Sequence, residues 1–148
     1  MKKQILDELK RSFPDWKFQH SKDKDWLYEV LSPNDKSKLV FSYYDRLNIK
    51  FGKENLEFFH VPDSIDTLEK IKSEKLVYIE YILDRELAMQ HSFEVPDGLP
   101  ELQGCALIDS SEIPQSNDEY YFANKIRITS WLGTYNSEKI AKYGSQTA

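Results

Sequence analysis

Cysteine and long apolar runs are what the sequence most clearly lacks. Cys105 is the only cysteine among the 148 residues, so no disulfide can form within the chain. No stretch approaches the roughly 18 uncharged apolar residues that a membrane-spanning helix requires. Asp7, Glu8 and Arg11 interrupt the continuous apolar segment that a secretion signal would need. The sequence therefore predicts a cytoplasmic protein with no membrane partner.

The short motifs that mark many catalytic and phosphate-binding sites are missing as well. The five glycines are isolated from one another, which excludes a glycine-rich phosphate loop. The sequence has no GxSxG nucleophile motif, no CxxC pair and no complete EF-hand spacing. The charged residues nearest Cys105 in the sequence are acidic, and a reactive thiolate needs a cation or a helix N-terminus, so we interpret Cys105 as a small apolar filler. On this basis we expect no cofactor, no metal site and no catalytic residues.

The overall composition is typical of a globular domain. Hydrophobic residues make up 40% of the chain and charged residues 30%, a balance that suits a folded chain rather than a disordered one. A chain of 148 residues can bury a sizeable core. Because neither a linker nor an internal repeat divides the sequence, we expect a single domain over residues 1–148.

Hydrophobic periodicity predicts one helix followed by a series of strands. Ile5, Leu9 and Phe13 are four residues apart, which is the spacing of a helical apolar stripe, and Pro14 ends this stripe. Apolar and polar residues then alternate in five short runs that polar turns separate. These runs cover residues 16–20, 26–30, 39–43, 47–51 and 56–60. They predict an antiparallel meander with one apolar face.

The period changes after Pro62 to that of a helix, which we expect to continue to about residue 84. The run LVYIEYIL at its end could instead form a buried strand after a shorter helix. The remaining expected elements are strands at 87–93 and 126–132, a brief strand at 105–108, and one or two helical turns at SEKIAKYG. The predicted fold is α+β: a curved antiparallel sheet, made of a meander of about five strands plus two later strands, packed against one or two helices.

Charge is distributed unevenly along the chain, whose net charge is −5. Residues 54–119 contain 16 Asp and Glu but only 4 Lys and Arg, whereas the segments on either side are mildly basic. A field of this sign repels phosphate, so we expect no general binding to nucleic acid. It favours a basic protein as the partner.

The most acidic part of the chain is the segment 94–119, which contains no lysine or arginine and is rich in proline and glycine. Structureless loops of such length are uncommon in compact domains and are often functional. Acidic loops also keep proteins soluble, so a solvated surface loop is the competing interpretation. A carboxylate-rich loop can steer a basic partner and occupy the groove where that partner binds phosphate. The predicted partner-binding residues are Glu94, Asp97, Glu101, Asp109, Glu112, Asp118 and Glu119.

Three histidines are the candidates for catalytic or metal chemistry. His20, His60 and His91 each fall on the apolar face of an expected strand, so the folded sheet could bring them together. Three imidazoles can hold zinc and leave a fourth position for water, and imidazole suits acid–base work near neutral pH. None of them lies in a ligand-spaced motif such as HxH or HExxH, and ordinary packing at strand ends accounts for them better. A small hydrolase or metal-dependent enzyme is therefore the second hypothesis, and a small-ligand-binding module is the third.

The order of the elements resembles a known class of proteins. A short N-terminal helix leads into FPDWKF and the meander, and the edge LNIKFGKENLEFFH and the run YIEYILDRELAMQHSF follow. Over residues 1–93 this layout resembles the small cytoplasmic immunity proteins of bacterial polymorphic-toxin systems. The resemblance implies a non-enzymatic protein that binds a cognate toxin and blocks its active site. Many of these toxins are basic nucleases, so the leading hypothesis is a protein-binding inhibitor that occludes a basic toxin.

Overall fold

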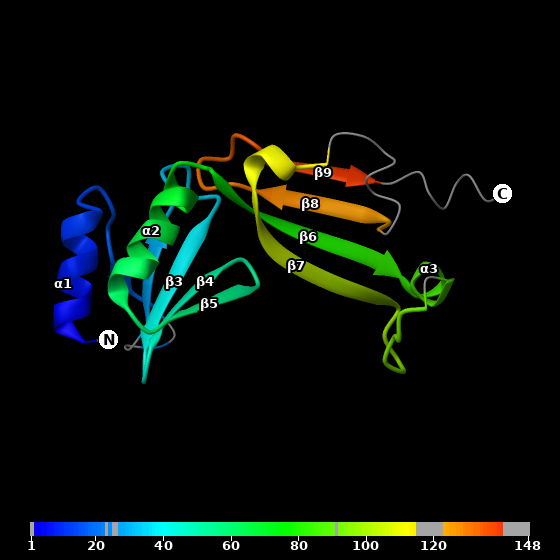
Figure 1. Cartoon of the computed structure of the whole chain (residues 1–148), viewed down its shortest axis with the longest axis horizontal. Helices are drawn as coiled ribbons and strands as arrows, with labels where there is room; N and C mark the ends of the chain where they lie inside the picture. Colours follow the sequence, from blue (N-terminus) through cyan, green and yellow to red (C-terminus); the bar gives the residue numbers. More distant parts are fainter. Residues whose placement is uncertain (1, 23, 25–26, 91, 115–122, 141–148) are drawn as a thin grey trace. The chain divides into compact units, whose positions relative to one another are not determined.

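The computed structural model describes residues 2–22, 24, 27–90, 92–114 and 123–140 (Figure 1). The chain forms two compact units. The first unit consists of residues 1–76 together with 130–134, and the second consists of residues 77–129 together with 135–148. Two units of packing can belong to one folding domain, so the single domain expected over residues 1–148 stays a prediction.

The first unit is built on a five-stranded antiparallel meander, which confirms the prediction from alternating apolar residues. Its strands are β1 (Gln19–His20), β2 (Tyr28–Leu31), β3 (Lys38–Tyr43), β4 (Leu47–Phe51) and β5 (Glu54–Phe58), adjacent in that order. Phe41 lies opposite Ile49 and Leu39 lies opposite Phe51. All four side chains are fully buried, so these cross-strand pairs form the core face of the sheet.

Two helices complete the first unit, α1 (Lys3–Ser12) and α2 (Val61–Lys72). They contact each other, and α2 also contacts β5. Each helix buries apolar residues three positions apart, which places them on one face. These residues are Leu6 and Leu9 in α1, and Leu68 and Ile71 in α2. The predicted N-terminal helix is therefore confirmed.

The strand alternative for LVYIEYIL is confirmed, and the favoured prediction of a helix to about residue 84 was wrong. β6 (Leu76–Asp84) occupies this stretch. Glu74 has a positive φ of 62°, which is incompatible with a continuing α-helix. The β-branched and aromatic side chains that follow suit a strand, and Ile79 pairs with Ile128 far along the chain.

The strand expected over residues 87–93 was also wrong, because the helix α3 (Arg85–Gln90) begins there. The Asp84 carboxylate accepts a hydrogen bond of 2.7 Å from the backbone N–H of Leu87, which is the contact of a helix N-cap. Leu87 and Ala88 are buried beside Leu83, so α3 packs on the end of β6. The N-cap and the burial of one helix face therefore favour a helix here, although apolar and polar residues alternate in the sequence as they do in a strand.

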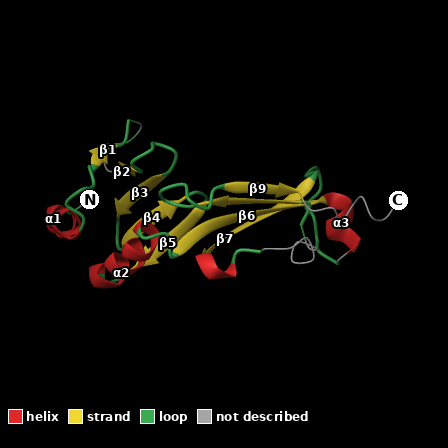
Figure 2. Ribbon diagram, turned by 90° about the horizontal axis from the view of Figure 1, so that it is seen from above, coloured by secondary structure: helices red, strands yellow, loops and turns green. Residues whose placement is uncertain are grey.

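The second unit contains a four-stranded sheet in the order β7-β6-β8-β9 (Figures 1 and 2). The remaining elements are β7 (Glu101–Asp109), the single 3₁₀ turn η1 (Ser110–Glu112), β8 (Lys125–Thr129) and β9 (Ser137–Ile140). The strand expected at 105–108 lies within β7. The strand expected over 126–132 is confirmed for residues 126–129, which lie in β8, and was wrong for residues 130–132, which form no strand. Helical turns were expected from residue 137, which was wrong for residues 137–140 because β9 pairs there with β8; residues 141–144 lie outside the described residues.

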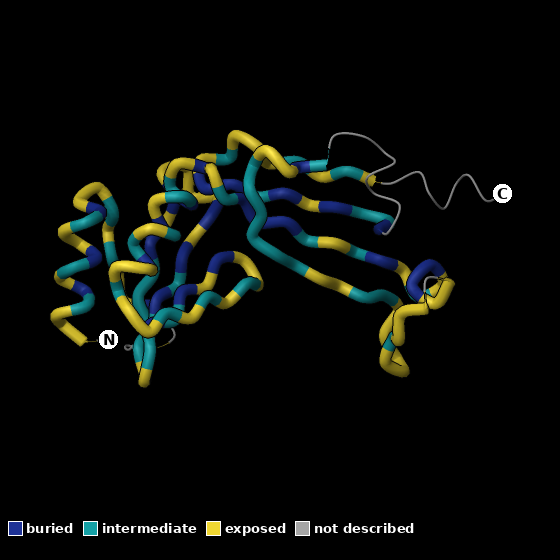
Figure 3. Tube along the Cα trace, in the orientation of Figure 1, coloured by how far each residue is buried: buried dark blue, intermediate teal, exposed yellow. Residues whose placement is uncertain are grey.

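One apolar cluster lies at the centre of the second unit, and Figure 3 shows its strands with buried segments along β6 and β8. Its buried members are Val77, Ile79, Ile113, Ala123, Ile126 and Ile128. The α+β class and its antiparallel strand pairing are confirmed, while the strands after residue 75 form a sheet of their own. None of the described helices has the length and apolar character needed to cross a bilayer.

Candidate partner-binding site

The acidic residues selected from the sequence lie in three structural settings in the second unit. Two are in the loop of residues 92–100, two are the ends of β7, and one is in η1. In that order they are Glu94, Asp97, Glu101, Asp109 and Glu112. Asp118 and Glu119 lie outside the described residues. The acidic segment is therefore not one long loop, because part of it is an edge strand of the sheet.

Arg85, the first residue of α3, organises the loop of residues 92–100. Its guanidinium Nη1 donates hydrogen bonds of 3.1 Å to the carbonyl oxygens of Pro96 and Leu99. Its Nη2 lies 3.8 Å from Asp97 Oδ1. One cation therefore holds the loop backbone while compensating only one of the two loop carboxylates. Within the described part of the chain, Glu94 has no ion-pair partner.

This loop and the adjoining helix α3 expose three large apolar side chains that the sequence analysis did not select. Met89 is 60% exposed, Phe93 47% and Leu99 48%. Met89 and Phe93 line a groove of ≈ 560 Å³ together with Glu94, Asp97 and the Arg85 side chain. We call Met89, Phe93, Glu94, Asp97 and Leu99 the loop surface; Figure 3 shows the segment after α3 as almost wholly exposed. Exposed apolar residues gathered among carboxylates are typical of a protein-binding surface.

The loop surface rests on an ordered base. The backbone N–H of Phe93 donates to the carbonyl oxygen of Ala88 at 2.9 Å, and the N–H of Arg85 donates to that of Pro100 at 2.8 Å. Beneath it, Val95 and Leu102 pack against the small cluster that α3 forms with β6. The surface is therefore presented by a backbone tied at both ends, which lowers the entropy lost when a partner binds.

Two of the predicted residues already have local structural roles. Asp109 accepts hydrogen bonds from the backbone N–H of Ser111 at 2.9 Å and from its hydroxyl at 2.7 Å, which caps η1. Glu101 accepts a hydrogen bond of 2.8 Å from Gln103 Nε2. Glu94 and Asp97 on the loop, and Glu112 on η1, are the exposed members of the described set.

The described histidines do not form a shared site. His20 is on β1 and His60 follows β5, and these strands are the two opposite edges of the first sheet. Four strand spacings of about 4.8 Å separate the edges, too far for two ligands of one metal ion. Both histidines are exposed, and the His20 ring lies 4.5 Å from that of Tyr28. His91 lies outside the described residues, and the described part of the chain contains no cluster able to hold a metal ion.

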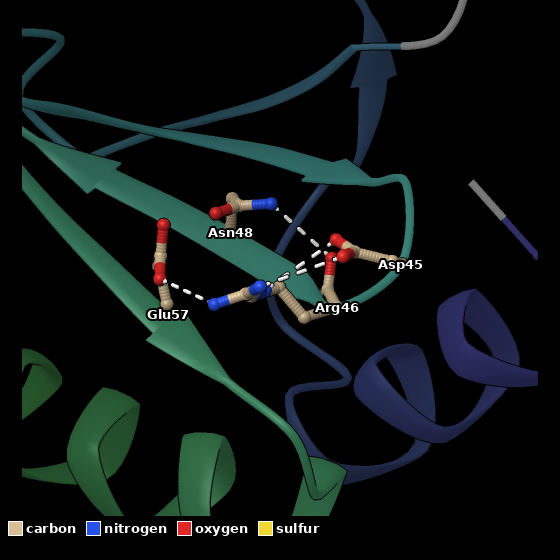
Figure 4. Close-up of polar contacts among 4 residues, drawn as sticks. All are labelled: Asp45, Arg46, Asn48 and Glu57. Carbon is tan, nitrogen blue, oxygen red and sulfur yellow. Dashed lines mark hydrogen bonds and ion pairs between the residues drawn. The ribbon is translucent and has the colours of Figure 1, made fainter.

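Figure 4 shows a charged cluster in the first unit, at the turn between β3 and β4. Arg46 Nη1 donates to Glu57 at 2.9 Å, while Nε and Nη2 donate to Asp45 at 3.4 Å. The Arg46 hydrogen bond lowers the pKa of Asp45, and the Asp45 hydrogen bond raises the pKa of Arg46. Asn48 Nδ2 adds a 3.2 Å bond to the Arg46 carbonyl oxygen. Because the Arg46 guanidinium binds the carboxylates of both Asp45 and Glu57, we interpret this cluster as a structural link between the turn and β5.

The loop surface is thus a described site at which exposed charge and exposed apolar area occur together. It offers contact to another molecule, with carboxylates for cations and a methionine, a phenylalanine and a leucine for burial. Comparisons of the chain with protein-family models, with curated proteins and with solved structures found no significant match.

Proposed function

We propose that this chain is a non-enzymatic protein-binding inhibitor, an immunity protein that binds and occludes a basic toxin. The observation that carries the proposal is the loop surface, where Met89, Phe93 and Leu99 are exposed beside Glu94 and Asp97. The layout resemblance over residues 1–93 supports the same class of function.

The two kinds of side chain would have different tasks in binding. Carboxylates at the rim of an interface mainly accelerate encounter with a basic partner, and their effect weakens as salt screens the charges. Affinity comes chiefly from a few apolar or aromatic side chains that become fully desolvated at the centre. On the loop surface, Glu94 and Asp97 would steer the partner, while Phe93 and Met89 would anchor it. Occlusion then follows if the acidic loop occupies the partner's phosphate-binding groove.

Neutralising the acidic segment is expected to release the partner. Bait protein would be compared with a variant in which all seven predicted acids carry Gln or Asn, using native lysate at low and at moderate salt. The wild type should retain one basic protein that forms a stoichiometric complex, and the variant should lose it, because the steering charges are gone. Gel filtration of the purified pair checks the stoichiometry.

A smaller charge change allows a matched control. Glu94→Gln with Asp97→Asn removes two exposed acids of the second unit, whereas Asp7→Asn with Glu69→Gln removes two exposed acids of the first. With the purified partner, the loop pair should slow association several-fold and flatten its salt dependence, while the control pair should leave both nearly unchanged. Equal effects of the two pairs would show that only net charge matters and would remove the loop from the interface.

The apolar anchors give an independent prediction. Met89→Ser with Phe93→Ser should raise the dissociation rate and weaken affinity by about tenfold or more, because desolvated anchors dominate interface energies. Leu31→Ser is the control, because the Leu31 side chain of the first unit is about as exposed as that of Phe93. Affinity that survives the double substitution would contradict the anchoring role.

The enzyme built on His20, His60 and His91 stays an untested alternative with no geometric support from His20 and His60.

A further inference from the structure

We propose that the first unit carries a separate small-molecule site, a pocket that takes a zwitterion with an aromatic side chain, the chemical class of aromatic amino acids and their dipeptides. The pocket has a volume of ≈ 530 Å³, within the range of small-ligand sites. All of its lining residues belong to the first unit, so the inference does not depend on the loop surface or on the proposed inhibitor function.

The apolar wall of the pocket comes from an aromatic cluster and two leucines. The Trp16 ring stacks on Phe13 with centroids 4.2 Å apart and is tilted against Trp131 at 5.4 Å. Leu31 and Leu132 also line the pocket, and they stay 48% and 49% exposed. A flat apolar group that covers exposed apolar side chains of the pocket removes their surface from water, which favours binding. An aromatic group can also stack on the tryptophan ring.

Hydrogen bonds hold the two segments of the wall together, although they are far apart in the sequence. Asn34 Nδ2 donates to the carbonyl oxygen of Leu132 at 3.0 Å. The Ser37 hydroxyl donates to the carbonyl oxygen of Ser130 at 3.4 Å. The Glu74 carboxylate accepts from the N–H of Leu132 at 3.3 Å. The pocket is therefore preformed, which reduces the ordering entropy lost on binding.

The charges around the pocket indicate a ligand that carries both signs. Lys72 Nζ lies 3.8 Å from Asp15 Oδ2, and these two lining residues offset each other. Lys17 and Asp35 also line the pocket, and neither forms an ion pair with any described residue. A carboxylate would find a cation at Lys17, and an ammonium group would find an anion at Asp35. A ligand with only one of these charges would leave the opposing residue, which is exposed, paired with water alone.

L-phenylalanine is the first probe, titrated into the full-length protein by isothermal calorimetry. We expect one saturable site with a dissociation constant between about 10 μM and 1 mM, as ligands of this size allow. Two analogues test the class: 3-phenylpropionate lacks the ammonium group and 2-phenylethylamine lacks the carboxylate. Each should bind several-fold more weakly than the amino acid, since one ion pair with an exposed residue is then lost.

Two substitutions test the charge assignment. Lys17→Gln should remove the advantage of phenylalanine over the amine, and Asp35→Asn should remove its advantage over the acid. Asn accepts the positive φ of 59° at position 35, so the fold should persist. Lys10→Gln and Asp7→Asn, exposed charges on α1 that do not line the pocket, should change nothing.

Several outcomes would overturn the inference. These are the absence of saturable heat up to about 10 mM phenylalanine, analogues that bind as well as the zwitterion, or substitutions of Lys17 and Asp35 without effect. Met89→Ser with Phe93→Ser should not alter phenylalanine binding. The failure of this site and the failure of the loop surface are therefore distinguishable.

Discussion

Replacing Trp131 by alanine is expected to lower the free energy of unfolding of the first unit by about 3–5 kcal/mol. The Trp131 side chain is 1% exposed and is the largest fully buried side chain of the described residues. Its ring lies 5.4 Å from that of Trp16 and 6.4 Å from that of Phe51, so it joins the α1–β1 connection to the core face of the sheet. Truncation removes these contacts and leaves a cavity that rigid strands cannot fill.

Urea unfolding followed by tryptophan fluorescence checks this value, because Trp16 and Trp131 both belong to the first unit. The adjacent substitution Leu132→Ala, at a half-exposed side chain, is the control and should change stability by about 0.5 kcal/mol or less. Trp131→Phe keeps a ring in place and remains measurable if the alanine variant does not fold. If Trp131→Ala and Leu132→Ala unfold at the same urea concentration, the buried Trp131 ring does not make the expected contribution to stability.

The fold of the first unit was predictable because its interactions are local. Each strand of the meander pairs with its neighbour in sequence, so alternation and short turns contain nearly all the information. Residues 76–84 lack that advantage. Their apolar positions fit a helix or a buried strand, and the choice depends on pairing with β8, as in Ile79 with Ile128. Local periodicity does not reveal a partner so distant in sequence.

The candidate site was predictable only in its charge. The acidic bias around Glu94 and Asp97 is visible in composition, but the exposed apolar residues beside them are not. Met89 and Phe93 alternate with polar residues and were therefore interpreted as one face of a strand. The signal that could have corrected this interpretation is Asp84, because an Asp three residues before Leu87 can cap a helix. Once α3 forms, Leu87 turns inward and Met89 turns outward.

Glu74 is expected to contribute the second large effect, since Glu74→Gln should lower the free energy of unfolding by about 2–4 kcal/mol at neutral pH. The residue follows α2 with a positive φ of 62°, a position at which glycine is usual. Its buried carboxylate accepts from the N–H of Leu132 at 3.3 Å, from the N–H of Thr134 at 3.1 Å and from the Thr134 hydroxyl at 2.5 Å. A glutamine amide keeps one acceptor oxygen, but it turns its NH2 group toward the donors that the other carboxylate oxygen accepts from, and it loses the charge.

The substitution Glu74→Gly distinguishes the contribution of the carboxylate hydrogen bonds to stability from the cost of the positive φ. Glycine relieves the strain of the positive φ but cannot accept any of the hydrogen bonds, so the variant should still be clearly less stable than the wild type. Unfolding curves followed by tryptophan fluorescence compare the two variants with Ser73→Ala, whose hydroxyl is exposed at the same helix end. A glycine variant as stable as the wild type would show that the carboxylate contacts contribute little.

The pH dependence identifies the ionised carboxylate as the source of this stability. Burial by itself raises the pKa of Glu74, but the hydrogen bonds from Ser130, Thr134 and Leu132 outweigh burial and lower its pKa below the usual value. A carboxyl group with a lowered pKa in the folded state contributes stability that is fully present above its unfolded pKa of about 4.3 and disappears as the pH falls through the folded value. The difference in unfolding free energy between wild type and Glu74→Gln should therefore be constant from about pH 7 to 5 and decrease as the pH falls below about 4. Taking this difference cancels the titration of the other carboxylates, and a difference that stays constant into acid would show that ionised Glu74 does not hold residues 130–134.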